Sequence, residues 1–182
     1  FKKLNWLKHI LNKLMPSMGK LVVPFGGLPV ILSFILVLWS FYFAGWIHAG
    51  SLPLIKKITL GVAMMTVLGI YDDIYHCPPK TKLLFQTVIA VILFYAGFQI
   101  DRIGDVVELG SFSIFLTVFW IVGITNSINL VDGIDGLASG LVLLSCITLS
   151  FVYLERDMVE ASLLAVILTG SILGFFVFNF PP

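Results

Sequence analysis

The sequence contains few charged residues for its length. Of its 182 residues, 12% are charged and 59% are hydrophobic, and the mean hydropathy is +1.05. A soluble domain carries roughly 25% charged residues, so this composition excludes an ordinary soluble domain. The sequence therefore predicts a membrane protein whose expected partners include the lipid bilayer.

The net charge is close to zero, and the sequence contains few cysteines. The formal net charge is +1, whereas nucleic-acid-binding domains usually carry a strongly basic stripe, so we expect no nucleic-acid partner. The two cysteines are too few for a disulfide framework. Cys77 falls in a predicted loop and Cys146 in an apolar run, which makes pairing geometrically unfavourable. We expect both to be free thiols.

The N-terminal region lacks a signal-peptide pattern. Residues 1–20 instead alternate lysines with apolar side chains, which is typical of an amphipathic helix on the membrane surface. We predict that this segment is cytoplasmic or interfacial. The chain begins at Phe1 and stops at Pro182, directly after an apolar run, so we also expect further sequence at both ends.

Long apolar runs are what the sequence does contain. A helix needs about 20 mostly apolar residues to cross a bilayer, and six stretches meet or approach this length. They are Gly27–Trp46, Ile58–Tyr71, Leu83–Phe98, Phe112–Val131, Leu137–Leu154 and Ala161–Phe180. The predicted fold is an all-α polytopic membrane protein with about six transmembrane helices, forming one partial transmembrane domain over residues 1–182.

Charge distribution predicts the sidedness of the connecting segments. Alternating crossings place residues 1–26, the segment 72–82 and the turn near Asp132 on one side. That side holds seven lysines, against four basic residues on the other, so the positive-inside rule makes it cytoplasmic. On the opposite side, glycines favour a short hairpin over residues 99–110, and we expect its acids to be solvated.

The first polar cluster on the predicted cytoplasmic side is the pair Asp72-Asp73, at the end of an apolar span. Adjacent helical residues point about 100° apart, so the two carboxylates should play different roles, one binding metal and the other accepting a proton or orienting a group. Like charges this close raise one pKa unless a cation neutralises them. A plain structural cap at the end of the span remains an alternative.

The second cluster is the run from Asn126 through Asn129, Asp132 and Asp135, with polar side chains every three residues. Such spacing keeps neighbours on one helix face, so the first three can line a shared cavity. Carboxylate and amide oxygens suit Mg²⁺, which usually takes one or two carboxylates together with substrate phosphates. Helix capping at a turn is the structural alternative.

Between these clusters, Lys82 and Gln86 lie four residues apart near a predicted helix start, and both could face the site. A lysine beside carboxylates is a suitable point charge for phosphate. Positive-inside anchoring explains Lys80 and Lys82 equally well. His76 is a weaker candidate metal ligand, because a single histidine in a loop is usually a bystander.

Together these motifs resemble the polyprenyl-phosphate N-acetylhexosamine-1-phosphate transferases, glycosyltransferase family 4. The resemblance rests on four motifs: Gly26-Gly27, Asp72-Asp73 followed by Pro79-Lys80-x-Lys82-Leu-Leu-x-Gln86, the run from Asn126 to Ala138, and Asn179-Phe-Pro. It implies a bacterial inner-membrane enzyme of about ten spans, with a cytoplasmic active site, acting in cell-envelope polysaccharide biosynthesis. Undecaprenyl phosphate would attack a UDP-N-acetylhexosamine and release UMP.

The resemblance also implies site roles and a cofactor. Asp72, Asp73, Asp132 and Asp135 would be catalytic, with Mg²⁺ held by Asp132 and Asp73. Mn²⁺ could replace Mg²⁺, and the enzyme could form a homodimer. The substrate-binding residues would be Lys82, Gln86, Asn126 and Asn129.

The motif after the aspartate pair favours the N-acetylglucosamine-1-phosphate branch of the family, because Tyr75 and His76 replace the lysine usual in phospho-N-acetylmuramoyl-pentapeptide translocases. That second branch is retained as an alternative, as is a proton-coupled transporter, since intramembrane acids also mark proton paths.

Overall fold

The computed structural model describes residues 27–104, 106–132 and 136–179. The predicted amphipathic segment 1–20, Gly26, Asp105 and Asp135 lie outside the described residues, as does the Phe-Pro that follows Asn179.

Six α-helices make up most of the described chain, and each corresponds to one predicted span. They are α2 (Leu28–Phe43), α3 (Leu52–Tyr75), α4 (Pro79–Tyr95), α5 (Ser113–Val131), α6 (Leu137–Glu155) and α7 (Val159–Asn179). The second predicted span was too short at both ends, because α3 extends from Leu52 to Tyr75. The third begins at Pro79, four residues before its predicted start, since a proline is well tolerated in the first turn of a helix.

Four helical segments are long and apolar enough to cross a bilayer: Ala49–Tyr75, Gly110–Val131, Leu137–Glu155 and Val159–Val177. Helix α2, with 16 residues, is apolar but shorter, and α4 has 17 residues. The prediction of an all-α, multi-pass membrane protein is therefore confirmed.

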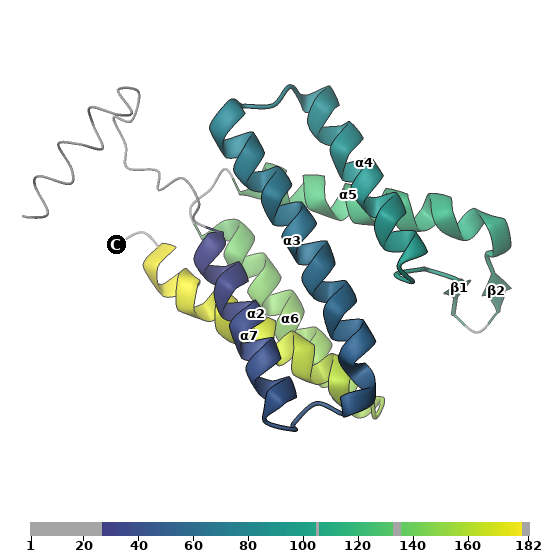
Figure 1. Ribbon diagram of the computed structural model, residues 1–182, viewed down its shortest axis with the longest axis vertical. Coiled ribbons are helices and arrows are strands. Elements are labelled where there is room, and N and C mark those ends of the chain that lie inside the picture. The colour runs from purple at the N-terminus through teal and green to yellow at the C-terminus, as the bar shows by residue number, and fades with distance from the viewer. Residues whose placement is uncertain (1–26, 105, 133–135, 180–182) are drawn as a thin grey trace, which may run out of the picture.

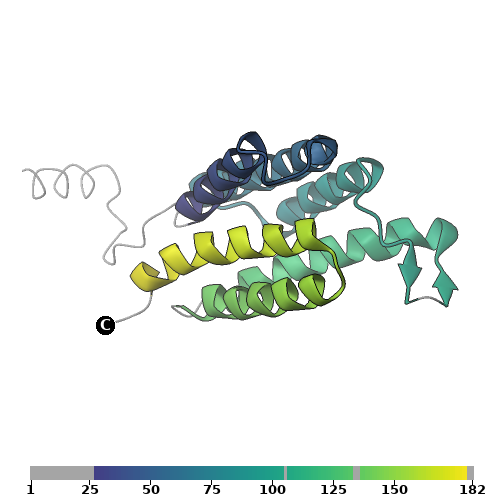
Figure 2. The same cartoon turned by 90° about the horizontal axis from the view of Figure 1, so that it is seen from below.

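The helices lie in two layers (Figures 1 and 2), with α2, α3 and α4 in one and α5, α6 and α7 in the other. Contacts of α2 with α7 and of α4 with α5 join the layers. One buried cluster includes Leu38, Ile55 and Ile167, and a second contains Leu68, Ile89 and Leu93. Many large apolar side chains point outward, as expected for helices that face lipid.

The connections at one end of the bundle are short and locally stabilised. Strands β1 (Arg102–Ile103) and β2 (Val107–Glu108) form the predicted antiparallel hairpin, with Arg102 paired to Glu108. Ser51, in the 3-10 helix η1 (Ala49–Ser51), donates a hydrogen bond to Glu160 at the start of α7. Glu108 and Glu160 therefore have structural partners at this end of the bundle.

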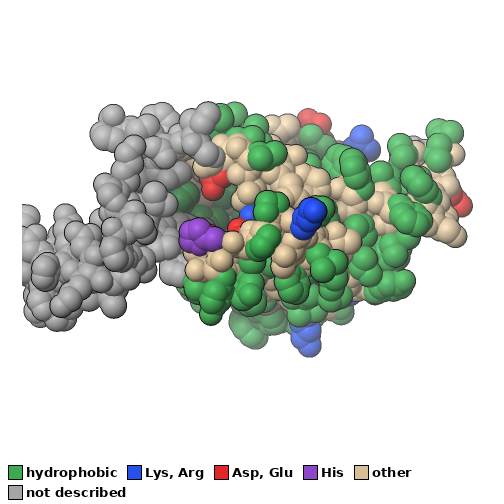
Figure 3. Space-filling model, turned by 90° about the horizontal axis from the view of Figure 1, so that it is seen from above, with side chains coloured by type: hydrophobic (Ala, Val, Ile, Leu, Met, Phe, Trp, Pro, Cys, Tyr) green, Lys and Arg blue, Asp and Glu red, His purple; other side chains and the backbone are tan. Residues whose placement is uncertain are grey.

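The other end of the bundle carries the predicted polar clusters. It is formed by the start of α2, the α3–α4 turn, the end of α5 and the start of α6 (Figure 1). Viewed onto this end, acidic and basic side chains and a histidine lie together among hydrophobic side chains (Figure 3). Elements distant in sequence thus bring their polar residues to one place.

Candidate active site

Asp72 and Asp73 lie inside the last turn of α3, rather than in a loop as predicted from the sequence. The helix continues to Tyr75, and His76 ends it in the left-handed conformation with φ of 50°. The Asp72 carboxylate accepts a hydrogen bond from the Cys77 backbone N–H at 3.2 Å, which favours this turn. The sequence analysis kept a cap at the end of the span as the structural alternative for this pair, and Asp72 makes such a contact.

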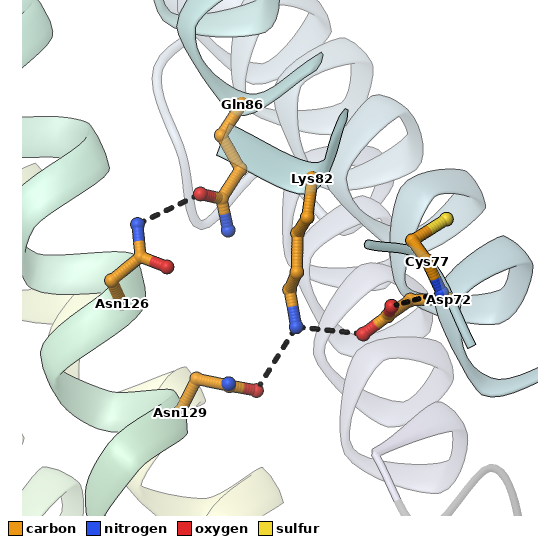
Figure 4. Close-up of polar contacts among 6 residues, drawn as sticks. All are labelled: Asp72, Cys77, Lys82, Gln86, Asn126 and Asn129. Atoms are coloured by element: carbon orange, nitrogen blue, oxygen red, sulfur yellow. Dashed lines mark hydrogen bonds and ion pairs between the residues drawn. The ribbon is translucent and has the colours of Figure 1, made fainter. Parts of the chain in front are cut away.

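Lys82 links the two predicted clusters. Its Nζ lies 2.7 Å from Asp72 Oδ2 and donates a longer bond of 3.4 Å to Asn129 Oδ1 (Figure 4). The side chains of Lys82 and Asp72 are only about one-fifth exposed (20% and 22%). Partial burial strengthens this pair relative to a fully solvated one. The ammonium group therefore sits at the junction of α3, α4 and α5.

Gln86 lies one turn further along α4 and contacts the same helix as Lys82. Its Oε1 accepts a hydrogen bond of 2.8 Å from Asn126 Nδ2, and its side chain is 1% exposed (Figure 4). The predicted shared face of Lys82 and Gln86 thus meets the predicted shared face of Asn126 and Asn129. Two parallel links, one charged and one between amides, hold α4 against α5.

Asp73 has a different environment from Asp72, as their angular separation on the helix requires. It lines a hollow of about 480 Å³ between α2, α3, α4 and α5. The other described lining residues are uncharged: Gly27, Leu28, Ile31, Gly61, Val62, Met65, Thr66, Gly69, Ile70, Leu93, Ile121 and Thr125. The two carboxylates therefore face a cation in one case and a largely apolar hollow in the other.

The hollow was not predicted from the sequence, although a signal was present. Gly61, Met65 and Gly69 recur every four residues along α3 and so share one face. At Gly69 the absence of a side chain leaves open space, whereas at Gly61 it admits the Leu93 side chain of α4, which would lie 2.9 Å from a Cβ. On α5, Thr125 lines the same hollow immediately before Asn126.

Asp132 caps the C-terminal end of α5, where its backbone N–H bonds to the Ile128 carbonyl at 3.0 Å. Partial burial raises the pKa of the Asp132 carboxyl above its ordinary value, because desolvation disfavours the charged form. A bound cation would oppose this shift. Asp135 lies outside the described residues, and α6 begins after Gly136, whose φ of +77° suits glycine.

The described residues contain no group of three acidic, histidine or cysteine side chains placed to hold a metal. Mg²⁺ does not require one, since substrate phosphates and water complete its shell. Within the described chain, the ion pairs are Lys82–Asp72 and Arg102–Glu108, so Asp73 and Asp132 have no cationic partner there. Their carboxylate oxygens are the hard donors that Mg²⁺ takes, whereas Asp72 is already neutralised by Lys82.

The chain was compared with known proteins. The family model for glycosyl transferase family 4 matches residues 55–182. A probable undecaprenyl-phosphate N-acetylglucosaminyl 1-phosphate transferase of Bacillus subtilis is 34% identical over 180 residues, covering 96% of this chain and 47% of that protein. A phospho-N-acetylmuramoyl-pentapeptide-transferase of Streptococcus uberis is 33% identical over 189 residues, covering 96% and 54%.

A second phospho-N-acetylmuramoyl-pentapeptide-transferase, from Streptococcus agalactiae, is 31% identical over 189 residues, again covering 96% of this chain and 54% of that protein. The chain thus spans about half the length of these curated relatives. No solved structure matches significantly. Because the family match includes both polar clusters and the relatives align with nearly the whole chain, the chain belongs to glycosyl transferase family 4, as its motifs predict.

Proposed function

We propose that the protein containing this chain transfers N-acetylglucosamine-1-phosphate from its UDP-sugar to undecaprenyl phosphate in bacterial envelope polysaccharide synthesis. An oxygen of the lipid phosphate attacks the β-phosphorus of the UDP-sugar. The bond from that phosphorus to the bridging oxygen breaks, and UMP leaves with the electron pair. The products are UMP and a polyprenyl-diphospho-sugar.

The observation that best supports this proposal is the position of the Lys82 ammonium. It lies where three helices meet, between Asp72 and Asn129, and is 2.7 Å from the Asp72 carboxylate. The next residue, Asp73, lines the hollow. A lysine ammonium is a point charge that suits phosphate oxygens. Phosphoryl transfer depends mainly on positioning and electrostatic stabilisation, and such a charge contributes to both.

The hollow beside Asp73 supports a lipid acceptor. On α3 its lining extends from Gly61 to Asp73, which is roughly 18 Å at 1.5 Å per helical residue. An apolar chain lying in such a hollow would keep its phosphate beside the carboxylate at the end. Asp73 would then lie beside the lipid phosphate, where a cation that it holds would offset the phosphate charge.

Mg²⁺ is proposed to bind at Asp73 and Asp132, with Asp135 completing the acidic set. When bound, the ion would stabilise negative charge on the phosphates. Asn126 and Asn129 would contribute polar contacts to the donor nucleotide. Lys82 would orient the phosphates in the same way whether the bound ion is Mg²⁺ or Mn²⁺.

Two alternative functions share part of this chemistry. The phospho-N-acetylmuramoyl-pentapeptide translocase reaction uses the same chemistry with a different sugar, and identities of 34% and 33% to members of the two groups do not separate them. A proton-coupled transporter is less well supported. Its polar sites usually lie at broken helices near the membrane midplane, whereas the acids here lie at the ends of α3 and α5.

The test is transfer by the full-length protein in membranes or detergent. Radiolabelled UDP-N-acetylglucosamine should move into an undecaprenyl lipid fraction, with one UMP released per sugar. Transfer from UDP-N-acetylmuramoyl-pentapeptide alone would assign the other branch. An intact, folded protein that transferred no UDP-N-acetylhexosamine would refute the proposal.

The proposed cytoplasmic site also predicts sidedness. Cys77, which is partly exposed in the α3–α4 turn, should react with an impermeant thiol reagent only after cells are permeabilised. A Val106→Cys variant places a thiol at a residue that is 90% exposed in the hairpin, and it should react in intact cells. Cys146 is buried and serves as the unreactive reference. Labelling of Cys77 from outside intact cells would contradict the proposed orientation.

A further inference from the structure

Gln86 is one of the most deeply buried polar side chains in the described chain, at 1% exposure. It lies on α4 and points toward α5, where its Oε1 accepts a hydrogen bond from Asn126 Nδ2 (Figure 4). Such a side chain has almost no surface with which to touch a nucleotide. Its influence on a substrate would therefore pass through the residue that it contacts.

A backbone carbonyl decides which way the Asn126 amide faces. Asn126 Nδ2 donates to Val122 O at 2.8 Å as well as to Gln86 Oε1 at 2.8 Å. Rotating the amide by 180° would bring Oδ1 against the Val122 carbonyl oxygen, and two acceptors repel. The amide nitrogen must therefore face Val122, so the remaining N–H needs an acceptor, which Gln86 supplies.

Both N–H groups of Asn126 are thus committed, and its Oδ1 is left as an acceptor. In Figure 4 this oxygen points toward the space beside Lys82 and Asn129. Among the described residues, no donor hydrogen-bonds to this oxygen. It is therefore directed at whatever occupies the candidate active site.

We infer that Gln86 is a positioning residue that fixes the Asn126 amide so that its oxygen faces the substrate or its bound cation. The inference rests on the proposed transferase function. The matching ligand chemistry is a hydrogen-bond donor or a hard cation, since an amide oxygen accepts from the one and ligates the other. A phosphate oxygen would be repelled at this position, which leaves phosphate to Lys82.

A double-mutant cycle in the full-length enzyme separates positioning from direct contact. Gln86→Met keeps the length of the side chain but removes the acceptor. It should lower kcat about tenfold, which corresponds to losing one oriented interaction in the transition state. In an Asn126→Leu background, the same change should alter residual kcat less than about twofold, because the group that it positions is gone.

Thr117→Val is the matched control. Thr117 is 2% exposed and accepts a hydrogen bond from the Ile100 backbone N–H at the opposite end of the bundle. The change removes one hydrogen bond from a side chain that is buried about as deeply as Gln86. It should therefore lower the thermal midpoint of unfolding and leave the kcat of the folded enzyme unchanged. Equal kcat losses in Thr117→Val and Gln86→Met would show a general packing effect and overturn the inference.

A readout that does not need turnover is the ¹⁵N-labelled side-chain amide of Asn126, assigned by its disappearance in Asn126→Leu. The chemical shifts of its two amide protons should differ from the wild-type values in Gln86→Met. They should equal the wild-type values in Thr117→Val. Unchanged shifts in Gln86→Met, or multiplicative kcat losses in the cycle, would refute positioning. If the wild-type enzyme transfers no sugar, the proposed function fails, and the amide signal alone decides the role of Gln86.

Discussion

Replacing Asp132 with asparagine should lower turnover by about 100- to 1000-fold while the protein still inserts and folds. The substitution keeps the side-chain size and removes the charge proposed to bind Mg²⁺. Loss of one electrostatic contact to a transferring phosphoryl group costs about 3–4 kcal/mol, and each 1.36 kcal/mol is tenfold in rate. Folding should be little affected, because the cap at the end of α5 uses the Asp132 backbone rather than its carboxylate.

The control for this substitution is Asp157→Asn, at the opposite end of the bundle. Asp157 is exposed and has a φ of 57°, a conformation that asparagine tolerates well. Its turnover should equal that of the wild type. Both variants should be measured across a series of Mg²⁺ concentrations. Near-normal turnover of Asp132→Asn at every Mg²⁺ concentration would show that Asp132 is not a metal ligand.

Replacing Lys82 with methionine should lower turnover by at least about 100-fold. The change keeps an unbranched side chain but removes the ammonium group between Asp72 and Asn129. The Asp72 carboxylate, 22% exposed, then has no cation beside it and repels substrate phosphates. Truncating one partner of such a partly buried pair leaves the other charge uncompensated, so thermal stability should fall as well.

Lys80→Met provides a matched comparison two residues away. Lys80 is exposed and makes no ion pair within the described chain. Its substitution removes the same charge from the same turn and should change turnover less than about threefold. The kcat and KM for the UDP-sugar should be measured for both variants after correction for folded fraction. Equal losses would mean that the turn acts only through its total positive charge.

The sequence predicted the helices well because their apolar runs are long and separated by charged or glycine-containing segments. Boundaries were less accurate where polar residues belong to a helix. Asp72 and Asp73 suggested a loop, yet α3 continues past both because the Asp72 carboxylate accepts a backbone N–H beyond the helix end. The stabilising contact is formed only once the chain has turned, so apolarity alone cannot reveal it.

The sequence predicted which residues belong to the candidate site better than it predicted how they contact one another. Spacing placed Lys82 with Gln86, and Asn126 with Asn129, on shared helix faces. The face of α4 that meets α5 depends on how the two helices are rotated against each other. That rotation depends on tertiary packing, such as the contact of Ile121 on α5 with the buried cluster that contains Ile89 and Leu93 of α4. The Gln86–Asn126 bond joins residues 40 positions apart and could not be read from either motif alone.

The Asp72–Lys82 ion pair has a consequence for biosynthesis. Its members are 10 residues apart, whereas Lys82 and Asn129 are separated by 47. The chain is made from its N-terminus, so α3, the turn and α4 are complete before α5 has been made. The carboxylate at the end of α3 can therefore have its counter-ion before Asn129 exists, and pairing lowers the cost of keeping an acidic residue at the end of a membrane span. The lysine proposed to bind phosphate in the full-length protein would thus first serve to hold the α3–α4 turn together.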